Sequence, residues 1–349
     1  MESKNKIILM REEQNGGRQL YIEFLKGITI FSIVIVHIEF CYMPSSPNFI
    51  SFILDKFIYC PKVFFFCSGF GLYYSHLRHP LQWTDFIKKR FVKVYLPYIL
   101  VIFICALVPY TYAEDDRFAA LLSHVFLYKM FVPKYIQSFG PYWFISSIFQ
   151  YYLLFYGIVK MKDKVNNTRL FLLIWVVISL IWSLLGGFFP QYKEMLGWVY
   201  DACFLGHGVI FVLGMLCAES LYQNKEFSIT AKQLLLVCIA MGIFLILLHG
   251  NEMYTLKEIP WDVMLLCLFT IAWIICGNTL QKFGGWIGSI SFECYLTHLL
   301  ILEGYYRLVK PVGITNEILF AGSGIIITIF AAWLYHQFVK RVLFSKIKM

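Results

Sequence analysis

The chain has 349 residues, of which 59% are hydrophobic and only 15% are charged, and its mean hydropathy is +0.67. This composition excludes an ordinary water-soluble domain, because too few charged residues are present to cover its surface. The formal net charge of +9 does not indicate a nucleic-acid partner, since the basic residues follow a membrane topology instead of forming one patch.

Apolar segments long enough to cross a hydrocarbon core of about 30 Å as helices recur along the chain. Backbone groups in lipid must be hydrogen-bonded within the protein, which favours helices. The sequence therefore predicts an all-α, polytopic membrane protein with about ten transmembrane helices. The predicted spans are residues 20–41, 57–75, 92–110, 142–159, 170–189, 203–221, 233–249, 261–279, 286–303 and 317–339.

The distribution of Lys and Arg predicts the orientation of these spans. With the N-terminus inside, 20 of the 30 basic residues fall on the cytosolic side and nine on the outer side. Lys and Arg are retained on the cytosolic side of short loops. Both termini are therefore predicted to be cytosolic.

No polar stretch of domain size interrupts the spans, so one membrane domain is predicted over residues 1–349. Residues 1–19 and 340–349 are interpreted as cytosolic tails, and residues 111–141 as an extracytoplasmic loop. The amphipathic part of this loop, around residues 118–130, is predicted to lie on or dip into the outer face. The ten cysteines show no metal-ligand spacing, and no metal site is predicted.

The first span carries several ionisable side chains, which are costly in a membrane and therefore candidates for function. Lys26 and His37 are eleven residues apart, about three helical turns plus 20°, with a rise of about 16 Å. This spacing suits an elongated anionic ligand that enters from the cytosol. The alternative is that Lys26 reaches the inner headgroups and His37 is a packing residue.

Three later segments add candidates. Ser68 and Gly69 lie side by side in the second span, where small residues let helices approach closely. Arg90 and Lys93 are one turn apart before the third span and are placed to bind phosphates, or alternatively anionic lipids. In the ninth span, His298 is predicted to lie at a depth similar to that of His37.

These motifs, taken in order, resemble the acyltransferase 3 family of integral membrane O-acyltransferases over nearly the whole chain. The resemblance rests on Lys26 and His37, on the Ser-Gly-Phe turn within residues 65–70, on Arg90 and Lys93 ahead of Pro97, on Tyr142-Trp143-Phe144, and on residues 291–298. At positions 26 and 93, Lys stands where the family has Arg, which keeps the charge but not the bidentate fork.

The resemblance implies a multi-pass enzyme of the bacterial cytoplasmic membrane, similar to the stand-alone members that modify surface polysaccharides. It would transfer an acyl group, most often acetyl, from cytosolic acyl-CoA, with acetyl-CoA as co-substrate, to a hydroxyl of an extracytoplasmic glycan. The implied catalytic residues are His37 as general base, Lys26 and His298. The implied donor-binding residues are Lys26, Arg90, Lys93 and Ser68, and the implied acceptor-binding residues are Glu39, Tyr142 and Trp143.

Several alternatives stay open at this point. Transfer can be direct or pass through an acyl-histidine. A polytopic transporter or a lipid-linked glycan flippase also buries charges, although neither an internal repeat nor paired broken helices are clear in the sequence. An inactive membrane partner with the same fold, and assembly as a homo-oligomer, are also left open.

Overall fold

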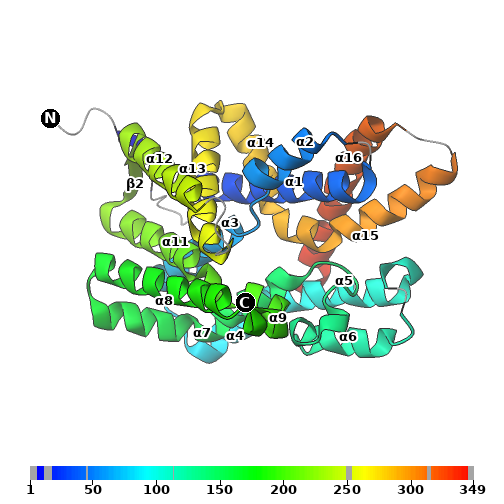
Figure 1. Cartoon of the computed structure of the whole chain (residues 1–349), viewed down its shortest axis with the longest axis horizontal. Coiled ribbons are helices and arrows are strands. Elements are labelled where there is room, and N and C mark those ends of the chain that lie inside the picture. Colours follow the sequence, from blue (N-terminus) through cyan, green and yellow to red (C-terminus); the bar gives the residue numbers. More distant parts are fainter. Residues whose placement is uncertain are drawn as a thin grey trace. The chain divides into compact units, whose positions relative to one another are not determined.

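In the computed structural model the chain is almost entirely helical, with a single pair of strands among the described residues (Figure 1). The structure describes residues 6–11, 18–44, 46–112, 114–248, 254–312 and 316–344. The predicted all-α, polytopic class is confirmed. The chain divides into two compact units, each built from three stretches of sequence. Residues 1–26, 60–82 and 147–286 form the first unit, and residues 27–59, 83–146 and 287–349 form the second.

The described residues of the first unit form helices and the strand pair. Its elements are β1 (Lys6–Arg11), the start of α1 (Leu20–Tyr42), α3 (Val63–Arg78), most of α7 (Trp143–Val165), α8 (Thr168–Phe188), α9 (Pro190–Leu196), α10 (Trp198–Asp201), α11 (Phe204–Asn224), β2 (Glu226–Thr230), α12 (Ala231–Leu247), η7 (Tyr254–Lys257), α13 (Glu258–Ile275) and most of α14 (Asn278–Ser289).

The second unit holds the rest of α1 and both C-terminal helices. Its elements are α2 (Asn48–Ile53), η2 (Leu54–Ile58), α4 (Trp83–Arg90), η3 (Phe91–Tyr95), α5 (Leu96–Leu107), η4 (Pro109–Thr111), α6 (Arg117–Val125), η5 (Lys129–Phe131), η6 (Pro133–Tyr135), α15 (Ser291–Val309), η8 (Lys310–Val312), α16 (Glu317–Phe338) and η9 (Val339–Phe344). The start of α7 also belongs to this unit.

Helix occupies most of each predicted span. Seven helices of the described residues are long and apolar enough to cross a membrane: α1, residues 83–107, α7, α8, residues 199–224, α13 and residues 317–343. Helices α3 and α12 are shorter, with 16 and 17 residues. The count of about ten crossings therefore stays a prediction, as does the single domain.

The ninth predicted span is not continuous. Residues 286–303 were expected to form one helix, but α14 ends at Ser289 and α15 begins at Ser291. Ile290 between them has φ −113° and ψ 10°, outside the helical range, which breaks the hydrogen-bond pattern. The apolar run alone gave no sign of this change.

The segment before the first span contains a strand, β1, that sequence reasoning did not predict. β1 pairs antiparallel with β2, which follows α11, with a register shift between Ile8 and Met10. Because strands that share hydrogen bonds lie together, the N-terminal segment and the connection after α11 are on one side of the membrane. This agrees with the prediction that both lie on the same face.

Helix-end contacts within each unit agree with the predicted alternation of spans. In the first unit, Lys162 near the end of α7 bonds Glu219 near the end of α11 at 2.7 Å. In the second, the Tyr335 hydroxyl near the end of α16 donates to the carbonyl of Pro97 at the start of α5, 2.6 Å away. In both pairs the two ends are predicted to be cytosolic. These contacts fix which ends lie together, not which face is the cytosol.

Close packing of α3 on α11 explains the small residues in both helices. A Cβ atom added at Gly69 would lie 2.0 Å from the carbonyl oxygen of Phe211, and one added at Gly214 would lie 2.0 Å from that of Phe66. Only glycine lets the two backbones approach so closely. The predicted packing role of the Ser-Gly pair is therefore confirmed for Gly69.

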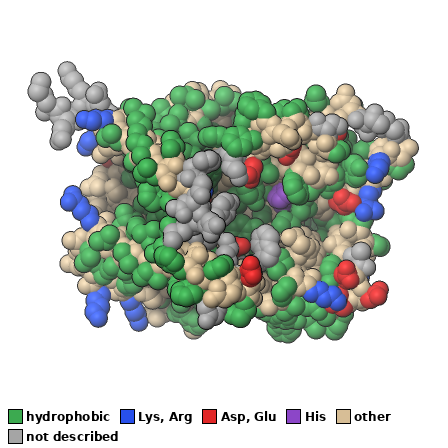
Figure 2. All heavy atoms as spheres, in the orientation of Figure 1, with side chains coloured by type: hydrophobic (Ala, Val, Ile, Leu, Met, Phe, Trp, Pro, Cys, Tyr) green, Lys and Arg blue, Asp and Glu red, His purple; other side chains and the backbone are tan. Residues whose placement is uncertain are grey.

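Large apolar side chains cover much of the visible surface (Figure 2). Phe40, Leu107, Ile275 and Ile318 are each more than three-quarters exposed. Isolated exposed apolar residues are common in any protein. A large number of them on long helices is what is expected of a surface that faces lipid.

Candidate active site

The second unit brings two histidines of the predicted site into contact. His37 comes from α1 and His298 from α15, and His37 Nδ1 lies 3.2 Å from His298 Nε2. The ring centroids are 5.0 Å apart. The similar depth that the sequence predicts for these residues agrees with this contact.

The hydrogen bonds determine which nitrogen of each neutral ring carries the proton. His298 Nδ1 lies 2.8 Å from the carbonyl oxygen of Tyr295, and a carbonyl only accepts, so this nitrogen donates. His298 Nε2 is then the acceptor, and His37 donates to it from Nδ1. The lone pair of His37 is therefore on Nε2, the nitrogen that faces away from His298.

Lys26 belongs to the first unit and is ion-paired. Its Nζ donates to Glu23 Oε1 at 2.6 Å, and the Lys26 side chain is one-quarter exposed. Glu23 Oε2 is buried and has no hydrogen-bond partner among the described residues. Helix α1 runs without a break from Leu20 to Tyr42. Lys26 and His37 are therefore separated by eleven residues of continuous helix, as the sequence predicts. A shared cavity for these two residues stays a prediction, because the unit boundary falls between them.

The predicted phosphate-binding residues lie where helix α4 continues through the π-helical turn η3 into α5. Arg90 is half-buried and Lys93 is exposed, and the Arg90 guanidinium lies 5.1 Å from the centre of the Phe86 ring. A donor site shared with Lys26 and Ser68 stays a prediction, since those two residues belong to the first unit.

Another imidazole of this unit, that of His336, was missed by sequence reasoning. His336 Nδ1 lies 2.9 Å from Glu293 Oε1, which joins the end of α16 to the start of α15. Glu293 lies within the ninth predicted span, and sequence reasoning did not identify its partner. A histidine in the last turn of the final span is the only sequence signal that pointed to it.

The predicted acceptor-binding residues have different surroundings. Tyr142 is only 2% exposed, and its hydroxyl donates to the carbonyl of Leu296 at 2.7 Å. Trp143, the next residue, is half-buried. Glu39 Oε1 accepts a short hydrogen bond from the Ser51 hydroxyl. Tyr142 thus holds α15 in place, whereas Glu39 and Trp143 are only half-buried.

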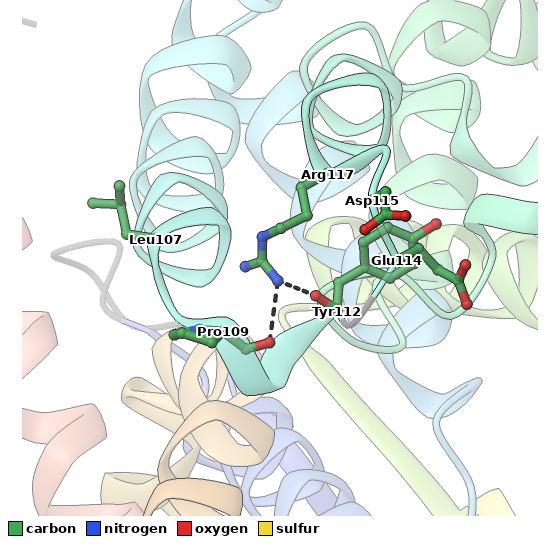
Figure 3. A pocket seen from close by; sticks show the side chains of 6 residues that line it. All are labelled: Leu107, Pro109, Tyr112, Glu114, Asp115 and Arg117. Atoms are coloured by element: carbon green, nitrogen blue, oxygen red, sulfur yellow. Dashed lines mark hydrogen bonds between the residues drawn. The ribbon is translucent and has the colours of Figure 1, made fainter.

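A cavity of about 370 Å³ lies beside the end of α5, and no predicted site residue lines it. Figure 3 shows Arg117 reaching across it to the carbonyls of Pro109 and Tyr112. The same guanidinium also bonds the carbonyls of Cys105, Ala106 and Val108. Its charge therefore caps the C-terminus of α5, and the other ionisable side chains that line the cavity include the carboxylates of Glu114 and Asp115.

The fold and the paired histidines define an integral membrane protein with two imidazoles in contact within its second unit. A family model described as an acyltransferase domain, that of acyltransferase 3, matches residues 19–337. The chain therefore belongs to this family of membrane acyltransferases. No curated protein and no solved structure gives a significant match.

Proposed function

We propose that the chain transfers an acyl group, acetyl in the first instance, from cytosolic acyl-CoA to a hydroxyl of an extracytoplasmic glycan in the bacterial cytoplasmic membrane. The observation that carries this proposal is the contact between His37 and His298, which leaves a lone pair on His37 Nε2. Family membership supplies the reaction class.

In this mechanism His37 Nε2 takes the proton of the acceptor hydroxyl while its oxygen attacks the thioester carbonyl carbon. The new C–O bond forms, the C–S bond breaks, and the CoA thiolate leaves. The imidazolium of His37 then returns its proton to the thiolate. His298 Nε2 accepts from His37 Nδ1–H throughout and stabilises the positive charge that develops on that ring.

His298 should therefore matter for turnover more than for binding. We expect His298→Ala to lower kcat by about 10- to 100-fold, because His37 loses the acceptor that fixes its tautomer. The donor KM should change little. Steady-state assays of CoA release, normalised to folded protein, check this expectation; an effect on KM alone would contradict it.

Arg90 is proposed to bind the phosphates of the donor together with Lys93 and Lys26. We expect Arg90→Ala to raise the KM for acyl-CoA by about 10-fold, with a small change in kcat, because one charge-assisted contact is lost. The matched control is Arg78→Ala, a basic residue at the end of α3. An effect confined to saturation by the acceptor would exclude Arg90 from the donor site.

The function itself is tested by the acyl content of the surface glycan. Mass spectrometry should find the glycan acylated in a deletion strain complemented with the wild-type gene, and unacylated after complementation with His37→Gln. A transporter or flippase predicts a different outcome, in which the amount of surface glycan changes and the acyl groups on the remainder do not.

A further inference from the structure

Lys129 is an unusual lysine, because it is almost completely buried. It lies in η5 and is only 1% exposed. Its Nζ donates to the carbonyl of Gly140 at 2.9 Å and points to that of Ser138 at 3.4 Å. None of the ion pairs of the described residues includes it. A buried ammonium without a carboxylate is costly, and its hydrogen bonds to carbonyls offset only part of that cost.

The carbonyls that Lys129 contacts belong to a strained turn, residues 138–142. Phe139 and Gly140 both have positive φ angles, 57° and 130°, and Phe139 adopts such a conformation only where its surroundings hold it. His124 lies 3.0 Å from the Ser138 carbonyl through Nε2, while its Nδ1 lies 2.7 Å from the Tyr98 hydroxyl. Lys129 and His124 thus fix the turn from one side.

The other side of the turn is bonded to α15, next to the candidate base pair. The Tyr295 hydroxyl donates to the Pro141 carbonyl at 2.8 Å, and the Tyr142 hydroxyl donates to the Leu296 carbonyl. Tyr295 also provides the carbonyl that accepts from His298 Nδ1. Tyr295 therefore bonds the turn through its hydroxyl and His298 through its backbone carbonyl, so that this residue links the turn to His298, which contacts His37.

We propose that Lys129 is a positioning residue, whose ammonium holds the 138–142 turn and thereby orients the His298–His37 pair for acyl transfer. This inference rests on the proposed function for its catalytic consequence, but the geometric part stands apart from it. The geometric part is that the turn held by Lys129 is bonded to Tyr295, the residue whose carbonyl accepts a hydrogen bond from His298.

The charge of Lys129 gives the proposal a pH dependence. Burial lowers the pKa of Lys129 to about 7, so the ammonium is present below that pH and is lost as pH rises through it. The groups that face it are His124 from α6 and the ring of Tyr142 from α7, 5.8 Å from Nζ. Burial and the charge of Lys129 also lower the pKa of His124, which leaves His124 neutral. The rate of acyl transfer by the wild-type protein should therefore fall as the pH rises through about 7.

The test compares Lys129→Met and Lys129→Arg with the matched control Lys134→Met. Lys134 is on the same connection, but its side chain is 55% exposed and paired with Asp116. In lipid nanodiscs, we expect Lys129→Met to lower kcat by about 10-fold with little change in KM. Lys129→Arg should restore part of the rate and move the alkaline decline to higher pH, because a guanidinium stays charged. Lys134→Met should match the wild type.

A second measurement does not depend on acyl transfer. The ring nitrogen NMR signals of His37 and His298, assigned with single His→Gln variants, should change in Lys129→Met and stay unchanged in Lys134→Met. Unchanged ring signals, or an unchanged kcat per folded molecule, would overturn the proposal. If Lys129→Met does not fold, the Lys129→Arg variant decides: a fall in its rate at the same alkaline pH as in the wild type overturns the proposal.

Failure of the proposed function gives a different result. A wild-type protein that transfers no acyl group contradicts the proposed function, while the ring signals of His37 and His298 still decide the role of Lys129.

Discussion

Replacing His37 by Gln is expected to reduce acyl transfer by about 1,000-fold or more, because the reaction loses its general base. Gln is close to His in size and can still donate a hydrogen bond to His298 Nε2, so the packing of α1 on α15 should persist. The loss should appear in kcat, since His37 is proposed to act on the reacting hydroxyl. CoA release by purified protein, per mole of folded enzyme, measures it.

The matched control for this variant is Gln at another histidine of the same unit, His336, which pairs with Glu293 and has no proposed part in the chemistry. We expect His336→Gln to keep most of the wild-type rate. Turnover by a well-folded His37→Gln enzyme close to that of the wild type would remove His37 from the mechanism.

Replacing Gly69 by Val is expected to prevent correct folding. The first added carbon would lie 2.0 Å from the Phe211 carbonyl oxygen, which belongs to backbone and cannot rotate away. Helices α3 and α11 would have to separate, at a cost of about 3 kcal/mol or more. Size-exclusion chromatography of a fluorescently tagged protein and its thermal midpoint should show little monodisperse material.

Gly71 is the control, because it is in the same helix and an added Cβ has no neighbour within 4 Å. Gly71→Val should express and elute as the wild type does. Equal behaviour of the Val variants at positions 69 and 71 would show that the close approach of the two helices does not limit stability.

Much of this architecture could be predicted from the sequence, because its physical signals are local. Long apolar runs give the helices, and a Ser-Gly pair gives the close contact of α3 with α11. The similar depth of His37 and His298 follows from their positions in the odd-numbered spans one and nine, both predicted to run outward. The sequence thus predicts that the two histidines lie at a similar depth in the membrane. It does not predict that they are in contact, because that depends on how α1 packs on α15.

Other features depend on contacts that no local pattern reveals. The pairing of β1 with β2 joins segments more than 200 residues apart, and the break at Ile290 lies within a segment that was predicted to be one continuous span. Lys129 was interpreted as one of the basic residues of the outer loops, because a lysine in a polar connection is ordinarily exposed. Lys129 can be buried because the turn places the carbonyls of Ser138 and Gly140 next to its ammonium, and this placement exists only in the folded chain.

The most direct test of the central claim uses the wild-type protein in sealed proteoliposomes, with radiolabelled acetyl-CoA on one face and the glycan on the other. The account predicts that label appears in the glycan, that CoA is released on the donor face in equal amount, and that both depend on His37. Label that stays in acetyl-CoA while the glycan crosses the membrane would contradict the claim and identify a transporter.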